Sequence, residues 1–147
     1  MKIIDGRVRL RTEQLLKPWT TELKPYFKEY IGWYGMKDRL TPLPVGEQIN
    51  IAKKAGIDQM IVCGGANDTD HIVELGKQFK EIIPIAAINI DNGINACLKE
   101  IKRCEKNVAA IHTSPFIVKK NANNKMFYPI YGLCELIKKP IILHGSL

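Results

Sequence analysis

The feature that most constrains this fold is an alternation of short apolar runs with segments of helical periodicity. From residue 45 onward, apolar side chains recur at three- and four-residue spacing in segments separated by runs that are apolar on both faces. The runs at 1–10, 57–63, 82–90, 108–112 and 140–144 predict strands, and 45–54, 68–80, 93–105 and 127–138 predict helices. Strands that alternate with helices in this way indicate a parallel sheet with right-handed crossovers.

Two parallel architectures fit five strands: an open doubly wound sheet and the first part of a (β/α)8 barrel. The chain has no G-x-G-x-x-G after its first strand and no G-x-x-x-x-G-K-[ST] sequence. A dinucleotide or P-loop domain therefore lacks its usual sequence support. A complete barrel needs about 250 residues, whereas this chain has 147.

Residues 11–44 interrupt the alternation. This segment contains four prolines and six Trp, Tyr or Phe residues. Its aromatic content is atypical of disorder, and connections this long in compact domains are usually functional loops. We expect a long aromatic-rich loop with one short helix near 23–30 that packs over one end of the fold.

Composition indicates one globular domain spanning 1–147, with 46% hydrophobic residues and a net charge of +7. The lysines are scattered in pairs and no basic segment is interleaved with aromatics, so the charge does not favour nucleic-acid binding. No apolar run approaches the length of a membrane span, and no signal peptide is visible, which predicts a cytoplasmic protein without a membrane partner. The cysteines form no C-x-x-C pair, which favours buried free thiols; they are Cys63, Cys97, Cys104 and Cys134.

Polar side chains follow the predicted strands where parallel folds place their chemistry. Arg7 and Arg9 are two residues apart, so they project from the same face of the first strand. His112 and His144 end two strands that follow one another along the chain. We expect these four side chains at one edge of the sheet. The third histidine, His71, falls inside a predicted helix and is expected at the surface.

Several segments, in this order, resemble the amidohydrolase-related family of metal-dependent hydrolases and decarboxylases: IIDGRVRL, AGIDQMIVCGG, IIPIAAINI, AAIHTSPF and MFYPIYGLCELIKKPIILHGS. The resemblance implies a (β/α)8 barrel with a divalent metal, usually zinc, at its mouth. His144 matches one of the family's metal ligands. Arg7 and Arg9 stand at the positions of the H-x-H ligand pair, and arginine has no lone pair to give a metal.

Together these observations predict an α/β chain holding the first five β/α units of an incomplete (β/α)8 barrel. In the enzyme hypothesis, Arg7 and Arg9 bind a small-molecule carboxylate, and His112 and His144 are catalytic. The reaction is a hydrolysis or a decarboxylation, assisted by a metal on His144 or metal-free. The arginines could instead be solvated or pair with an acidic residue among Asp5, Glu47 and Asp91, and His112 could be a hydrogen-bonded strand end.

The five predicted strands leave open edges. We expect either the N-terminal part of a longer barrel or a half barrel that covers its edge by association, for example as a homo-oligomer. The alternative function is therefore a catalytically inactive half barrel that acts as a binding or oligomerisation module.

Overall fold

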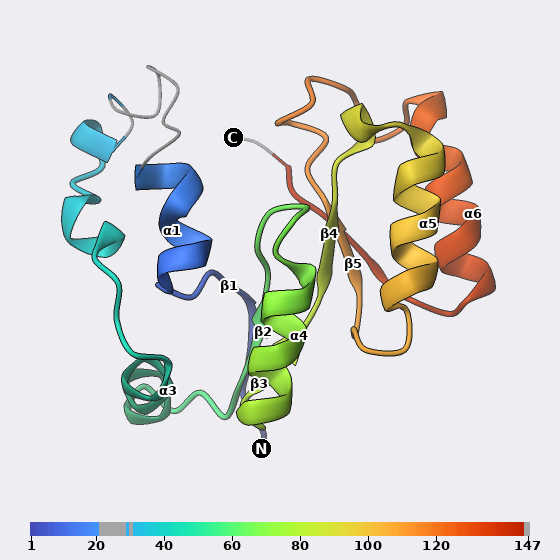
Figure 1. Ribbon diagram of the computed structural model, residues 1–147. Coiled ribbons are helices and arrows are strands. Elements are labelled where there is room, and N and C mark those ends of the chain that lie inside the picture. The colour runs from blue at the N-terminus through green and yellow to red at the C-terminus, as the bar shows by residue number, and fades with distance from the viewer. Residues whose placement is uncertain (21–28, 30, 146–147) are drawn as a thin grey trace.

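A computed structural model describes residues 1–20, 29 and 31–145 (Figure 1). The strands are β1 (Ile4–Val8), β2 (Gln59–Val62), β3 (Ile82–Pro84), β4 (Ala86–Ile88), β5 (Ile111–Thr113) and β6 (Ile141–Leu143). The α-helices that lie wholly within the described residues are α1 (Glu13–Thr20), α3 (Val45–Lys54), α4 (Thr69–Gln78), α5 (Ile94–Cys104) and α6 (Tyr128–Leu136). Short 3-10 helices span Lys37–Leu40, Ile90–Asn92 and Lys125–Phe127.

The strands form two parallel three-stranded sheets, with the orders β1-β2-β3 and β4-β5-β6. The predicted strand at 82–90 is divided at Ile85 between the two sheets. Its first part pairs with β2, with Ile82 opposite Met60, and its second part pairs with β5, with Ala86 opposite Ile111. One continuous run of chain thus takes part in both sheets.

The prediction of the first five β/α units of an incomplete (β/α)8 barrel is wrong for this structure, because the described residues form two small three-stranded parallel sheets and no barrel. Around Ile85 the backbone hydrogen bonds alternate between the two sheets, and the N–H of Ile85 itself donates to the carbonyl of Val62 in β2. Pro84 has no N–H to donate, and its carbonyl accepts a hydrogen bond from the backbone N–H of Ala109, on the side of the second sheet. The six strands of the described residues are also fewer than an eight-stranded closure requires.

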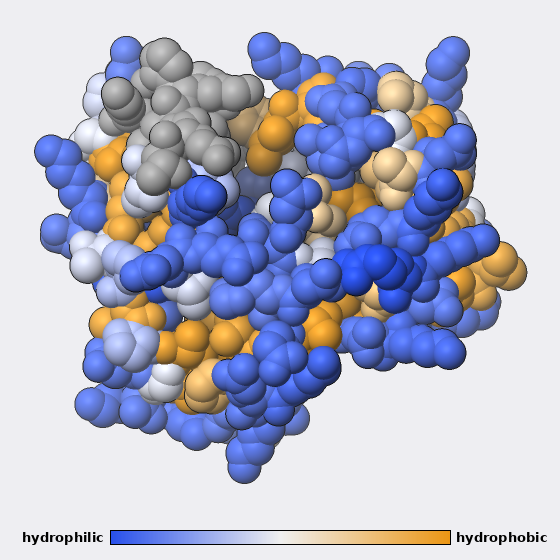
Figure 2. Space-filling view, viewed as in Figure 1, coloured by the Kyte–Doolittle hydropathy of each residue, from blue (hydrophilic) through white to orange (hydrophobic). Residues whose placement is uncertain are grey.

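Each sheet has its own apolar core. Ile49, Ile72 and Leu75 of α3 and α4 cover the first sheet, together with Met60 and Val62 of β2. The second core joins β4 and β5 to the helices α5 and α6, which lie side by side in Figure 1. Figure 2 shows apolar residues reaching the surface between α3 and α4, while hydrophilic residues cover much of the rest of this face. Burial of these helix faces supplies the main stabilising free energy of each half.

The segment 11–44 contains more regular structure than the sequence predicted. Helix α1 forms although Pro18 lies inside it, because the Thr12 hydroxyl accepts a hydrogen bond from the Leu15 N–H at 3.3 Å and caps its first turn. Leu15 and Leu16 are buried, so packing outweighs the proline. The helix predicted near 23–30 lies outside the described residues except for Glu29, which is helical.

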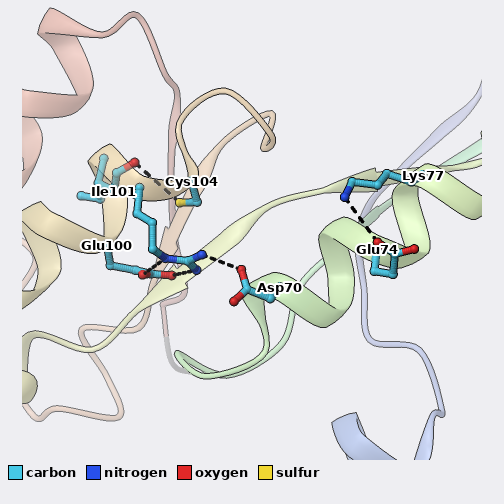
Figure 3. A network of polar contacts seen from close by, with 7 residues as sticks. Asp70, Glu74, Lys77, Glu100, Ile101 and Cys104 are labelled. Atoms are coloured by element: carbon cyan, nitrogen blue, oxygen red, sulfur yellow. Dashed lines mark hydrogen bonds and ion pairs between the residues drawn. The ribbon is translucent and has the colours of Figure 1, made fainter.

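An ion-pair network connects the helices of the two halves. Arg103 of α5 bonds Glu100 on its own helix at 2.7 Å and Asp70 of α4 at 2.7 Å. Figure 3 shows Asp70 and Glu100 facing each other across the gap between these helices. The pairs are partly exposed, so we expect a small contribution to stability.

The four cysteines are buried free thiols, which confirms the sequence prediction. Burial raises the pKa of the Cys104 thiol to about 11 and raises the pKa values of Cys97 and Cys134. In the described part of the chain, no helix combines the length and apolar character needed to cross a bilayer.

Candidate functional site

Arg7 and Arg9 differ in their exposure to solvent, although they are only two residues apart. Asp5 lies opposite Met60 and Val8 opposite Val62, so three residues of β1 span the distance of two in β2. This bulge, which contains Gly6 and Arg7, twists the strand end. Arg7 is exposed within β1, whereas Arg9 is half-buried just beyond it. Their surroundings therefore differ, although the alternation of a regular strand would place both on one face.

Arg7 reaches the opposite end of the strand order. Its Nη2 donates a hydrogen bond to Nδ1 of His144, just after β6, at 3.3 Å. The backbone N–H of His144 donates to the carbonyl of Thr113 at 2.9 Å, which fixes the residue beside β5. The first and last strands thus approach each other at their carboxyl ends, and the structure brings together Arg7 and His144 as the sequence predicted.

Ser114 is a member of this cluster that the sequence reasoning missed. Its Oγ lies 3.0 Å from Nδ1 of His144. Ser114 directly follows β5, two residues after His112. Extending the strand-end argument by two residues would have singled it out, because Ser114 is polar and leaves the same strand.

His112 lies in the middle of β5, opposite Ala87 of β4 and Ile142 of β6. Its side chain is buried, and its ring centroid is 6.1 Å from that of His144. Burial first, and then the charges of Arg7, His144 and Arg9, lower the pKa of His112 from 6.5 to about 4. Its Nε2 has no hydrogen-bond partner among the described residues. His112 is therefore a neutral imidazole at pH 7.

The same factors act more weakly on His144, which is partly exposed. Burial lowers its pKa, and the charges of Arg7 and Arg9 lower it further. Arginine has only donors, so the Arg7 contact requires an unprotonated Nδ1. Both histidine rings of the cluster are consequently held in the neutral form by their surroundings.

Arg9 approaches the cluster from the side of α1. Its guanidinium carbon lies 5.2 Å from the centroid of the Trp19 ring, a cation–π distance. Burial is the largest influence on Arg9 and lowers its pKa. Among the smaller influences, in decreasing order, Cys63 raises the pKa, Arg7 lowers it and Asp68 raises it. Arginine remains charged under all ordinary conditions, so Arg9 adds a second positive charge near the two histidines.

The loop after β2 lies near Arg9, because Cys63 and Asp68 of this segment both act on the pKa of Arg9. Asp68 is buried, and one of its carboxylate oxygens accepts a hydrogen bond from the Gly65 N–H at 2.6 Å. A Cβ on Gly64 would lie 2.6 Å from the Cβ of Asp68 and 2.8 Å from Cδ2 of Leu15. The absence of a side chain at Gly64 thus lets this loop pack closely against α1.

The alternative ion pairs for the arginines do not form. In residues 1–20, 29 and 31–145, neither Arg7 nor Arg9 makes a salt bridge to Asp5, Glu47 or Asp91. Asp91 pairs instead with Lys120 at 3.0 Å, and Asp5 accepts a hydrogen bond from the backbone N–H of Arg7. Both guanidinium groups thus keep donors for a ligand.

His71 was predicted to lie at the surface, but the structure leaves it only partly exposed. It is half-buried, and its Nε2 lies 3.2 Å from the Thr12 hydroxyl, which also caps α1. The first turn of α4 therefore contacts the start of α1, and His71 forms part of that contact rather than of the arginine–histidine cluster.

The side chains present do not fit the divalent metal that the family resemblance implies. No group of three His, Cys, Asp or Glu side chains suited to a metal ion occurs in the described part of the chain. Arg7 and Arg9 have no lone pairs to offer, and Nδ1 of His144 already accepts hydrogen bonds. The zinc expectation therefore rests on the resemblance alone, and we derive no chemical step through a metal.

The comparisons with known proteins give similarity in structure but no match by sequence. No family model matches the chain, and no curated protein matches it by sequence. The crystal structure of 4-oxalomesaconate hydratase from Rhodopseudomonas palustris superposes with a TM-score of 0.66 over 98% of this chain, at 16% identity. The chain spans 52% of the length of that hydratase. At this identity the similarity shows a distant relationship at the level of the fold alone.

Proposed function

We propose that this chain provides the carboxylate-binding and proton-transfer groups of a hydrolase or carboxy-lyase that acts on a small-molecule carboxylate. The observation that carries the proposal is the convergence of Arg7 of β1 with His112 in the middle of β5 and His144 just after β6. The fold-level similarity to a 4-oxalomesaconate hydratase is compatible with chemistry on small carboxylates.

The two arginines are suited to binding a carboxylate. A guanidinium group offers parallel N–H donors that match the two oxygens of a carboxylate. Arg7 is exposed and free of carboxylate partners among the described residues, whereas Arg9 is held over Trp19. In the proposed complex, Arg7 makes the bidentate contact and Arg9 supplies further positive charge.

The histidines are suited to proton transfer. A general acid or base must lie within hydrogen-bond reach of the reacting group. Because Arg7 contacts His144, a carboxylate bound by Arg7 would lie beside His144. His112 lies behind it, and its Nε2 is without a partner within the described structure. In hydrolysis, these rings would exchange protons with the attacking water and the leaving group. In decarboxylation, one ring would protonate the carbon that loses carbon dioxide.

Isothermal titration with acetate, malonate and succinate tests the binding part of this proposal. Arg7→Gln should weaken the tightest of these ligands about 10- to 100-fold, the range expected for one charge-assisted contact. Arg9→Gln should also weaken it. Arg39→Gln is the matched control, because it removes the same charge from an exposed position in the 3-10 helix Lys37–Leu40. Equal affinities in the wild type and Arg7→Gln would overturn the proposal.

A second candidate function is a binding or oligomerisation module without catalysis. It is favoured by the apolar residues Ile4 and Leu143, which are 46% and 41% exposed on β1 and β6. Each of these strands pairs with one neighbour among the described residues. Sedimentation that shows a discrete dimer, together with carboxylate binding but no consumption of any carboxylate in a proton NMR time course, would favour this module over the enzyme.

A further inference from the structure

We infer that Ser114 is a positioning residue that, together with Arg7, holds His144 with its proton on Nε2, so that His144 presents an N–H donor to the bound ligand. This inference rests on the proposed function, because it assigns His144 a role toward the carboxylate. It names a residue outside the predicted set and one protonation state of the ring.

Two side chains contact the same ring nitrogen of His144. Arg7 Nη2 lies 3.3 Å and Ser114 Oγ lies 3.0 Å from the same Nδ1 atom of His144. A guanidinium group can only donate, whereas a serine hydroxyl can donate or accept. Nδ1 must therefore be the acceptor toward Arg7, and the hydroxyl completes the arrangement by donating its own proton. A neutral imidazole that accepts at Nδ1 carries its hydrogen on Nε2.

The backbone supports this arrangement. The N–H of His144 is tied to the carbonyl of Thr113, the residue before Ser114. The two chain segments are therefore registered next to each other, and the Ser114 hydroxyl reaches the ring without depending on a long flexible side chain. No hydrogen bond to Nε2 of His144 occurs elsewhere in the described structure, so its N–H remains available to a ligand.

The chemical consequence is a site made of donors. Arg7 and Arg9 offer guanidinium N–H groups, and His144 adds an imidazole N–H. Such a set binds an anionic oxygen and can stabilise negative charge that develops on it. The same assignment opposes metal binding through Nε2, because that nitrogen already carries a hydrogen. It also makes His144 a proton donor rather than a base in its resting form.

The test is a two-bond proton–nitrogen NMR correlation of the histidine rings, recorded without ligand. In the wild type we expect an unprotonated, hydrogen-bonded Nδ1 and a protonated Nε2 on His144. In Ser114→Ala, Nδ1 loses one of its two hydrogen-bond donors, so its resonance should move toward that of a free unprotonated nitrogen. Ser114→Thr restores a hydroxyl and should return the wild-type pattern. A protonated Nδ1 in the wild type, or an unchanged Nδ1 resonance in Ser114→Ala, would overturn the inference.

Thr113→Val is the matched control for loss of a neighbouring hydroxyl. Thr113 Oγ1 is buried and has no hydrogen-bond partner in the described residues, and the carbonyl that His144 uses belongs to the backbone. This variant should leave the His144 ring pattern unchanged. If it reproduces the effect of Ser114→Ala, the change reports general disturbance of β5 and the inference fails.

Titration of malonate into the same samples separates this inference from the proposed function. The tautomer is assigned before malonate is added. A wild type with the expected tautomer that does not bind malonate contradicts the carboxylate proposal and keeps the role of Ser114. A wild type that binds malonate with a protonated Nδ1 contradicts the role of Ser114 and keeps the carboxylate proposal.

Discussion

The two sheets contribute different chemistry to one cluster. The first sheet supplies positive charge from β1, a bulged strand whose residues are exposed or half-buried. The second sheet supplies the imidazole groups from β5, whose three residues are all buried, and from the residue after β6. Charge thus comes from a strand in contact with solvent, and the proton-transfer groups come from a strand that packing holds in place. We expect substitutions in the first sheet to change binding and substitutions in the second to change stability as well.

The sharpest test of this difference compares one substitution in two strands. Ile111 on β5 is 0% exposed, whereas Ile4 on β1 is 46% exposed. Ile111→Ala should cost about 2–5 kcal/mol of unfolding free energy, because it leaves a cavity. Ile4→Ala should cost about 1 kcal/mol or less, because little buried surface is lost. Urea denaturation measures both values, and equal costs would remove the distinction between the two sheets.

The buried histidine of the second sheet predicts a dependence of stability on pH. The pKa of His112 is about 4 in the folded chain and about 6.5 when unfolded. Between these values the unfolded chain binds more protons, so stability is full above pH 6.5 and falls as the pH drops toward 4. The loss attributable to His112 is at most about 3 kcal/mol.

His112→Gln isolates that effect. The variant has no titrating ring at this position, so its unfolding free energy should vary less between pH 6.5 and pH 4 than that of the wild type. The slopes of the two curves are compared, since the absolute stability of the variant also reflects changed packing. Parallel curves over this window would show that His112 is not a buried neutral imidazole.

A smaller effect is expected in the loop of the first sheet that contacts α1. Gly64→Ala places a Cβ 2.6 Å from the Cβ of Asp68 and should destabilise the chain by about 1–3 kcal/mol. Gly65→Ala is the matched control, because its nearest contact is at 3.3 Å, to a carboxylate oxygen of Asp68. In thermal unfolding, the Tm of Gly64→Ala should be lower than that of Gly65→Ala. The reverse order would contradict the close packing of this loop.

The smallest effect concerns the ion pairs between the two halves. Arg103→Gln removes the contacts with Asp70 and Glu100, which are 78% and 25% exposed at their side chains. We expect a cost below about 1 kcal/mol, because solvent screens such pairs. Lys77→Gln removes a comparable exposed pair within α4 and should behave similarly. A loss of several kcal/mol in Arg103→Gln alone would mean that this network holds the halves together.

Sequence periodicity predicted the local elements better than their assembly. The apolar runs contain the strands because buried parallel strands are apolar on both faces. The division at Ile85 was not predicted, since it depends on which neighbour accepts or supplies each backbone hydrogen bond around Pro84. Helix α1 was also missed, because the penalty of Pro18 was visible in the sequence but the burial of Leu15 was not.

The candidate site was predicted in part for the same reason. Strand ends identified Arg7 and His144, and the structure places them in contact. The different surroundings of Arg9 arise from the bulge in β1 and from the position of Trp19, and neither follows from two-residue alternation. Ser114 was missed because the sequence shows that it follows a strand but not which side chain it faces.

A carboxylate site shared by the two sheets is tested most directly by asking whether one bound ligand depends on Arg7 of the first sheet and perturbs His144 of the second. Malonate is titrated into the wild type, Arg7→Gln and the control Arg39→Gln, and the ring resonances of His144 are followed by NMR. We expect a saturable shift of these resonances in the wild type and in Arg39→Gln. In Arg7→Gln we expect the affinity for malonate to be at least 10-fold weaker. No shift in the wild type, or the same affinity in Arg7→Gln, would contradict a carboxylate site built from the arginine of the first sheet and the histidine of the second.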